Sequence, residues 1–153
     1  MQTFLPYPDF KQSAQCLDRA RLGKQRVEVL QMLRALFGET KGYRNHPATL
    51  MWSNSINSLV NYGTAMCEEW ISRGYRDSCL EKIQSFRGIA ISIEPEWMGG
   101  PIHASHRAAL LHKDFEWYSK FKWQESPLEP LGSGSLPYYW PKVETIRWLD
   151  NVK

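Results

Sequence analysis

Cysteine is scarce in this sequence of 153 residues, and the three cysteines, Cys16, Cys67 and Cys79, are widely spaced. Their odd number and the lack of a CxxC pair argue against a disulfide framework. No uncharged apolar run reaches the roughly 18 residues that are needed to span a bilayer. The N-terminus also lacks a basic segment followed by a long apolar run, which is the pattern of a signal peptide. The sequence therefore predicts a soluble, cytoplasmic protein with reduced thiols and no membrane partner.

Signatures of the common catalytic and metal sites are missing as well. There is no nucleophile elbow, no phosphate-binding glycine loop, no HExxH helix and no Cys–His signature. His103 and His106 share a helix face, but a zinc site needs at least three protein ligands, and His112 and His46 have no recognisable ligand spacing. We predict no metal and no cofactor. The expected role of His103 and His106 is hydrogen bonding to a phosphate or base, and the alternative is that they are ordinary surface histidines.

The composition that remains is that of a globular protein. Hydrophobic residues make up 42% of the chain and charged residues 23%, which is enough to build one domain with a real core. The 7 Trp and 7 Tyr can fill a core or stack on bases and sugars. The formal net charge of +3 permits a polyanionic partner without demanding one.

The strongest pattern lies between Leu17 and Phe37. Apolar residues recur there at three- and four-residue steps, which predicts a helix with one face in the core and an end at Gly38. At roughly 100° per residue, Arg19 and Arg26 fall on that same face. A buried Arg needs an anionic partner, so we expect these two to point into a cleft and hold phosphate. The alternative is that they reach the surface or pair with carboxylates.

The face next to this stripe carries Arg21, Lys24 and Glu28. Asp18 and Glu28 are the acidic residues nearest to the basic set. Either one could serve as a general base, although a structural ion pair is the commoner role of such carboxylates.

Further helices are predicted along the chain. Pro47 suits a first helical position, so a second helix is expected over residues 47–72, with His46 or Asn45 as its cap. Asp77 is expected to cap a third helix over residues 78–86. Alternation of Ile89, Ile91 and Ile93 with small residues is a weak strand signal. A last helix, over residues 102–114, carries the two spaced histidines together with Arg107 and Lys113.

The C-terminal part has a different composition. Residues 126–137 are rich in Pro, Gly and Ser, which is typical of a loop, and residues 138–153 have enough aromatics to dock back onto the body formed by residues 1–125. The predicted fold class is mainly α, a compact single-domain helical bundle with long irregular loops and an aromatic C-terminal tail.

Several of these segments together resemble the pyrimidine-dimer DNA glycosylases of the bacteriophage endonuclease V type. Gln15 and Leu17, followed by a charged helix with Arg26, are similar to the first helix of that family. The wider pattern resembles its little-characterised bacterial branch and covers Gln2 to about Pro141. That pattern consists of QTFLPY, LDxxRLGKQRxE, RNHP, RGY after a helix that ends in Trp, SHR, and YxWP.

The resemblance implies a mostly helical domain that binds double-stranded DNA, excises a damaged base and nicks the abasic strand. In this family the α-amine at the mature N-terminus attacks C1′ of the sugar and forms a Schiff base, and a glutamate of the first helix assists. Here the second residue is Gln2 instead of Thr, and its bulk should leave Met1 in place, so the nucleophile would be the amine of Met1. Counted from Gln15, the position of the assisting glutamate is Gly23.

Two functions from different classes follow from these observations. In the first, the protein is a DNA glycosylase and abasic-site lyase, with Met1 as nucleophile and Glu28 or Asp18 as the assisting acid. In the second, the same cleft is a non-catalytic pocket for a nucleotide or modified base, for example one that sequesters a signalling nucleotide. A purely structural protein ranks last. The residues expected to contact nucleic acid or phosphate are Arg19, Arg21, Lys24, Gln25, Arg26, Asn45, His46, His103, His106, Arg107 and Lys113.

Overall fold

The computed structural model describes residues 1–150, and helices make up its regular structure. In this described part there are seven α-helices, one short 3-10 helix and no strand, which confirms the prediction of a mainly α fold. The elements are α1 (Phe10–Cys16), α2 (Arg19–Leu36), α3 (Pro47–Leu50), α4 (Ile56–Ser72), α5 (Leu80–Gln84), α6 (Ile102–Lys113), α7 (Phe115–Tyr118) and the 3-10 helix (Ser119–Phe121).

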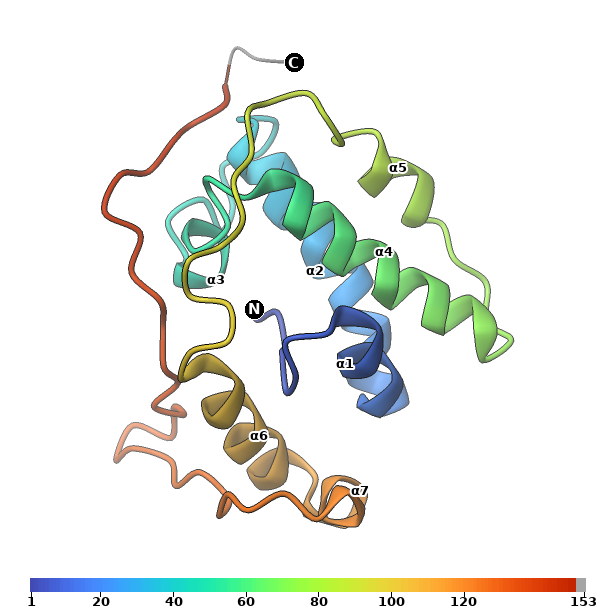
Figure 1. Cartoon of the computed structure of the whole chain (residues 1–153), viewed down its shortest axis with the longest axis vertical. Coiled ribbons are helices and arrows are strands. Elements are labelled where there is room, and N and C mark those ends of the chain that lie inside the picture. The colour runs from blue at the N-terminus through green and yellow to red at the C-terminus, as the bar shows by residue number, and fades with distance from the viewer. Residues whose placement is uncertain (151–153) are drawn as a thin grey trace.

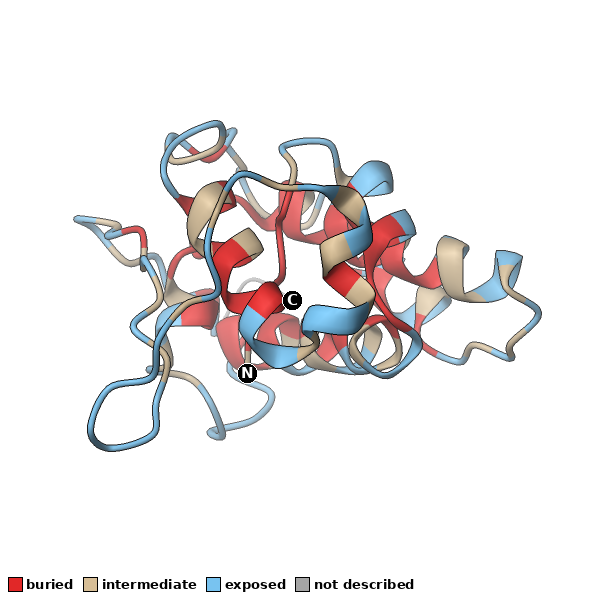
Figure 2. Cartoon of the chain, turned by 90° about the horizontal axis from the view of Figure 1, so that it is seen from below, coloured by how far each residue is buried: buried red, intermediate tan, exposed pale blue. Residues whose placement is uncertain are grey.

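Helices α2 and α4 form the centre of the fold and lie side by side (Figure 1). Gly63 of α4 permits this approach, because a Cβ atom there would lie 2.6 Å from Cγ1 of Val29 on α2. The apolar stripe predicted for α2 is buried in this contact, and α1 and α5 pack on α4. Figure 2 shows the buried residues gathered on the inner faces of the helices, while the long loops are exposed.

The start of α2 differs slightly from the prediction. The helix begins at Arg19 rather than at Leu17, because the carboxylate of Asp18 accepts a hydrogen bond from the backbone N–H of Arg21 and so caps the helix. Gly38, with φ +76°, follows the C-cap Phe37 and ends the helix as predicted.

The prediction of a single helix over residues 47–72 is wrong, because the chain turns after α3 and forms a second helix, α4. Its predicted start is confirmed: Pro47 is the first helical residue, and Nδ1 of His46 accepts a hydrogen bond from the backbone N–H of Ala48 at 3.0 Å. The turn places Trp52 in the core, where its indole N–H donates to Oγ1 of Thr3 at 3.1 Å. Burial of this large ring outweighs the continuity of the helix.

Two other predictions need correction. The strand expected at residues 89–93 does not form, and Ile91 and Ile93 are 76% and 53% exposed, so no packed face exists to support one. The third helix is shorter than expected, and its N-cap is Cys79 rather than Asp77, although the carboxylate of Asp77 accepts the backbone N–H groups of Cys79 and Leu80 just before the helix. No helix in the described part of the chain is long and apolar enough to cross a membrane.

The C-terminal segment runs along the outside of the helices and returns to them (Figure 1). Tyr138 and Trp140 pack against the core, and Leu149 is buried, with its backbone N–H donating to the carbonyl of Leu36 at 3.0 Å. The last three residues of the predicted tail, 151–153, lie outside the described residues.

Candidate functional site

The first six residues form an extended segment that runs into the core, and Gln2 to Leu5 are buried. An extended chain that joins no sheet must have its buried backbone groups satisfied by side chains. The amide of Phe4 donates to Oε1 of Gln25 at 2.6 Å, and the carbonyl of Phe4 accepts the hydroxyl of Tyr62 at 2.8 Å. The carbonyl of Gln2 accepts Nε2 of Gln25 at 2.8 Å. Side chains of α2 and α4 therefore fix this segment along its length.

Helix α6 holds the next residue of the segment through its two spaced histidines. The amide of Leu5 donates to Nδ1 of His106 at 2.8 Å, and Nδ1 of His103 lies 2.7 Å from the carbonyl of Leu5. Because Nε2 of His103 accepts the backbone N–H of Gly99 at 2.9 Å, its Nδ1 carries the proton and donates. Burial lowers the pKa of His106 to about 3, so this ring is neutral.

Four residues predicted to contact phosphate or line a cleft therefore have another role. His103, His106 and Gln25 are buried and bind the backbone of the N-terminal segment. The guanidinium of Arg107 donates to the carbonyl of Pro6 at 2.9 Å and forms an ion pair with Glu125. The prediction failed here because sequence alone does not reveal that a buried extended segment needs polar partners from distant helices.

This segment brings the α-amine of Met1 to α2. The amine lies 3.7 Å from Oε2 of Glu28, and the amide of Gln2 donates to the same oxygen at 3.1 Å. The other candidate acid, Asp18, lies at the start of α2, where it pairs with Arg21 and accepts the hydroxyl of Tyr118. The geometry thus brings Glu28, and not Asp18, to the amine.

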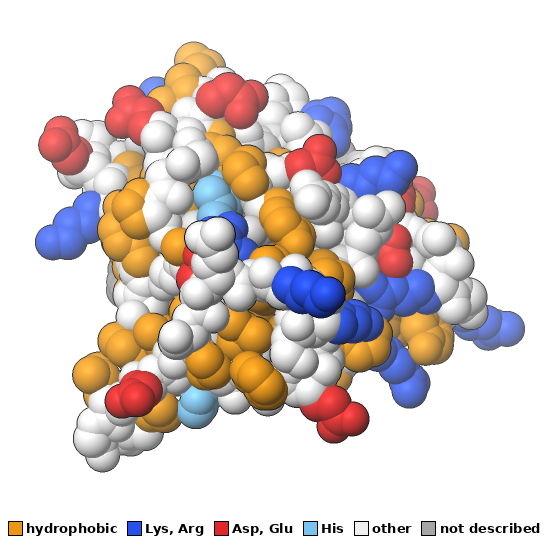
Figure 3. Space-filling view, turned by 60° about the horizontal axis from the view of Figure 1, so that its bottom comes forward, with side chains coloured by type: hydrophobic (Ala, Val, Ile, Leu, Met, Phe, Trp, Pro, Cys, Tyr) orange, Lys and Arg blue, Asp and Glu red, His pale blue; other side chains and the backbone are white. Residues whose placement is uncertain are grey.

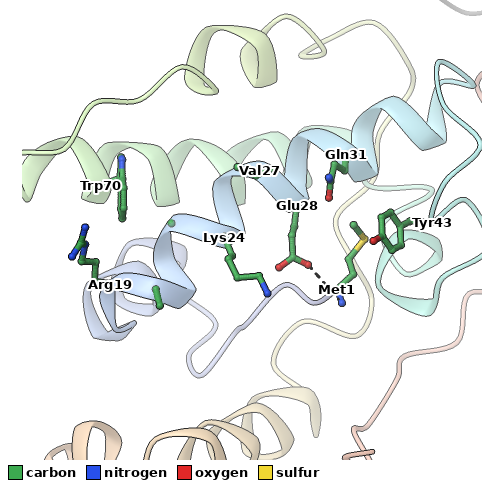
Figure 4. A pocket seen from close by; sticks show the side chains of 10 residues that line it. Met1, Arg19, Lys24, Val27, Glu28, Gln31, Tyr43 and Trp70 are labelled. Atoms are coloured by element: carbon green, nitrogen blue, oxygen red, sulfur yellow. Dashed lines mark ion pairs between the residues drawn. The ribbon is translucent and has the colours of Figure 1, made fainter.

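Two hollows meet at this amine–carboxylate pair. The larger has a volume of about 700 Å³, and Figure 4 shows Arg19 and Trp70 at one end of it, Tyr43 at the other, and Met1 and Glu28 between. The second has a volume of about 360 Å³ and shares Met1, Ala20, Lys24 and Glu28 with the first. Its remaining residues are Gln2, Phe4, Arg21, Gln25, Lys113 and Tyr138.

The second hollow is the more strongly basic of the two. Arg21, Lys24 and Lys113 line it, with Glu28 as the single carboxylate among its lining residues. Burial, followed by the nearby charges of Arg21 and Lys24, lowers the pKa of Lys113. Blue Lys and Arg side chains gather beside a band of hydrophobic surface in Figure 3. Three cations held close together in this way form a suitable place for an anion such as phosphate.

The two arginines do not form the predicted inward-facing pair. Arg19 lines the larger hollow, but it is exposed, and its guanidinium lies 5.0 Å from the ring centre of Tyr75. Arg26 forms an ion pair with Asp77 and lies 4.4 Å from the ring centre of Trp70. Projection on a helical wheel placed both near the core stripe, but aromatic and acidic residues from the end of α4 and from the segment after it cover that part of α2. The alternative stated from the sequence, pairing with a carboxylate, holds for Arg26.

Two residues of the loop before α3 lie near the amine. His46 caps α3, and burial together with the positive charge of the Met1 amine lowers its pKa. Tyr43 lines the larger hollow, and Asn45 is exposed without lining either hollow. Sequence reasoning did not select Tyr43, Trp70 or Tyr138 as site residues. The only available signal was the high aromatic content, which does not distinguish core from cleft.

Gly23, where the resemblance implies the assisting glutamate, lies under Trp70. A Cβ atom at Gly23 would be 3.0 Å from Cη2 of that indole, so a side chain there would displace the ring. Glu28 instead reaches the amine from more than one helical turn further along α2.

Fold and site together define a helical protein in which a basic cleft surrounds an amine–carboxylate pair. A family model described as pyrimidine dimer DNA glycosylase matches residues 1–82, which is more than half of the chain, and the chain belongs to this family. The match contains both Met1 and Glu28 and ends before α6. No curated protein and no solved structure matches the chain. Membership in this family supports a function like that of DNA glycosylases and DNA as the partner.

Proposed function

We propose that the protein excises a damaged base from duplex DNA and then cleaves the abasic strand, with the α-amine of Met1 as nucleophile and Glu28 as proton acceptor. The observation that carries this proposal is the 3.7 Å approach of the amine to Oε2 of Glu28 between two hollows. An amine needs a free lone pair to attack, and a carboxylate at this distance is placed to receive its proton.

The chemistry follows from the reactivity of an amine toward C1′ of the sugar. The lone pair of the amine forms a bond to C1′, the bond from C1′ to the base breaks, and the base leaves with that electron pair and takes up a proton. Loss of the amine proton to Glu28 and opening of the sugar ring give a Schiff base. Removal of a proton from C2′ then expels the phosphate at C3′ with its bonding electrons. Water finally hydrolyses the Schiff base and frees the amine.

The two hollows have different parts in this proposal. The smaller, basic hollow holds backbone phosphates through Arg21, Lys24 and Lys113. The larger hollow, with Val27 and Trp70 in its lining, receives the extruded base. The dense set of hydrogen bonds to the N-terminal segment fits this function, because covalent catalysis needs a nucleophile in a fixed position.

Borohydride trapping tests the proposal. Purified protein is mixed with duplexes that carry either a thymine dimer or an abasic site, and reduction turns a Schiff base into a stable adduct. We expect an adduct with both duplexes, at least 100-fold slower with Glu28→Gln, since a positioned proton acceptor contributes about 10²–10⁴ in rate. Intact-mass measurement establishes whether the purified protein has a free amine on Met1.

Two variants identify the reacting amine. A short peptide extension before Met1 should abolish the adduct, while the same peptide after residue 153 should leave it unchanged. An adduct that survives the N-terminal extension but disappears in Lys24→Arg would assign the reaction to Lys24 and overturn the role of Met1. No adduct with either duplex would overturn the proposal as a whole.

The size of the larger hollow favours a second candidate function, a binding pocket for a nucleotide. About 700 Å³ lies within the range of roughly 300–1,000 Å³ typical of small-molecule sites. Tight binding of a mononucleotide in a thermal-shift assay, combined with weak duplex binding that is lost in moderate salt, would support this function instead.

A further inference from the structure

Tyr43 has a backbone conformation that bulky residues rarely adopt. Its φ is +61°, in the left-handed region, and its side chain is 54% exposed. The preceding residue, Gly42, could take such a conformation without a steric penalty, yet it does not have a positive φ. Strain at an exposed aromatic residue, next to a glycine that could have relieved it, points to a function of the ring itself.

The loop on the C-terminal side of Tyr43 is fixed to the rest of the protein. Arg44 forms an ion pair with Asp150, and its guanidinium lies 4.2 Å from the ring centre of Trp148. The backbone N–H of His46 donates to the carbonyl of Tyr43 at 3.1 Å, and the ring of His46 meets that of Tyr43 edge-on at 6.4 Å. These contacts hold an exposed ring in one place, which lowers the entropy that it loses on binding.

The ring lies beside the amine that the proposed function assigns as nucleophile. Tyr43 lines the larger hollow, and Figure 4 shows it beside the side chain of Met1. For the amine to reach C1′, a nucleotide has to leave the base stack, and the loss of stacking has to be offset. Aromatic and apolar side chains that enter the stack provide this compensation in proteins that distort duplex DNA.

We propose that Tyr43 is the residue that enters the duplex and fills the space of the extruded nucleotide, and is therefore a positioning residue for base excision. This inference rests on the proposed function, in which the larger hollow receives that nucleotide. The partner surface of Tyr43 is the exposed face of a neighbouring base, and the contact is stacking, which is independent of base sequence.

A fluorescent duplex tests the proposal without any chemical step. The duplex carries 2-aminopurine beside a tetrahydrofuran analogue of an abasic site, which has no aldehyde and forms no Schiff base. Saturating wild-type protein should lower 2-aminopurine fluorescence several-fold, because the inserted ring stacks on the open face of that base and quenches it. Tyr43→Phe should keep most of this decrease, and Tyr43→Ala should lose it. An equal decrease with wild type and Tyr43→Ala, or no decrease with wild type, would overturn the inference.

Base excision provides the second readout. Tyr43→Ala should slow release of the damaged base at least 10-fold on a fully paired duplex, but less than 3-fold when the bases opposite the lesion are mispaired, since less stacking is then lost. Equal losses on both duplexes would contradict insertion into the stack. Tyr43→Gly removes the backbone strain, so its unfolding temperature should not fall although its activity does.

Phe115→Ala is the matched control. Phe115 is 58% exposed at the start of α7 and lines neither hollow, so this variant should behave like wild type in both assays. Trapping on an abasic duplex separates this inference from the proposed function. If the wild type is trapped normally but Tyr43→Ala gives the same fluorescence response as the wild type, the inference about Tyr43 fails and the proposed chemistry stands. If the wild type is not trapped but its fluorescence response depends on Tyr43, the proposed chemistry fails and the inference stands.

Discussion

Replacing Gln25 by Leu should both destabilise the protein and displace the amine of Met1, the proposed nucleophile. Gln25 is buried, and its amide accepts the backbone N–H of Phe4 at 2.6 Å while it donates to the carbonyl of Gln2 at 2.8 Å. Leucine has a similar volume but offers neither bond, so two buried backbone groups lose their partner. At about 1–3 kcal/mol for each such group, the expected loss is roughly 2–4 kcal/mol, allowing for partial relaxation.

Thermal unfolding measures the first effect. For a protein of this size 1 kcal/mol corresponds to about 2–4 °C, so the midpoint should fall by roughly 5–15 °C. Gln84→Leu, an exposed position at the end of α5, is the matched control and should change the midpoint little.

Borohydride trapping below the unfolding transition measures the second effect. Gln2 directly follows Met1, the proposed nucleophile, so loss of the anchor of Gln2 should reduce the trapping rate by about 10-fold to 100-fold, as expected for a displaced reacting group. DNA affinity and its salt dependence should remain at the wild-type level, because Gln25 is buried under the segment. If Gln25→Leu retained its stability and trapping rate but lost DNA affinity, Gln25 would be a DNA ligand and the account of the N-terminal segment would be refuted.

Three further predictions concern pH, a buried ion pair and the basic hollow. Burial lowers the pKa of His106 to about 3, whereas an unfolded histidine titrates near 6.5, so below pH 6.5 the unfolded state binds the additional proton. Stability should therefore fall with decreasing pH between about 6.5 and 3, by up to roughly 1.4 kcal/mol per pH unit, and His106→Gln should have a flatter stability–pH profile in urea titrations. Asp77→Asn removes the carboxylate that pairs with the mostly buried Arg26. This variant should lower the free energy of unfolding in urea by about 3 kcal/mol but leave the salt dependence of DNA binding unchanged. A weaker salt dependence would indicate that Arg26 contacts DNA. Lys113→Ala should lower the slope of log affinity against log salt by about 1, because one phosphate contact is lost. The control Lys82→Ala, on α5, should leave the slope unchanged. Equal slopes for the two variants would show that Lys113 does not contact phosphate.

The sequence was sufficient for those features that depend on residues close together in the chain. Repetition at three- and four-residue steps identified α2. Pro47 begins α3 and Gly38 follows the end of α2, as their backbone preferences predict. The fold class also follows from local patterns, and the short motifs of the N-terminal half indicated the family whose model matches residues 1–82.

The tertiary structure decided which polar residues belong to the site. Helical periodicity gives the direction of a side chain but not what lies in front of it, so His106, Gln25 and Arg26 all suited a phosphate cleft from the sequence. In the structure each is used by a distant part of the chain: two bind the N-terminal segment, and the third pairs with Asp77.

The same limit applies to the choice of acid and to Tyr43. Sequence reasoning left Asp18 and Glu28 as equal candidates, because the distance from either to Met1 depends on how residues 1–6 cross the helices. That path is fixed by hydrogen bonds between residues that are 21 to 101 positions apart. Local chemistry thus determined the helices and the family, whereas long-range packing alone brought the amine to Glu28 and the exposed ring of Tyr43 to the mouth of its hollow.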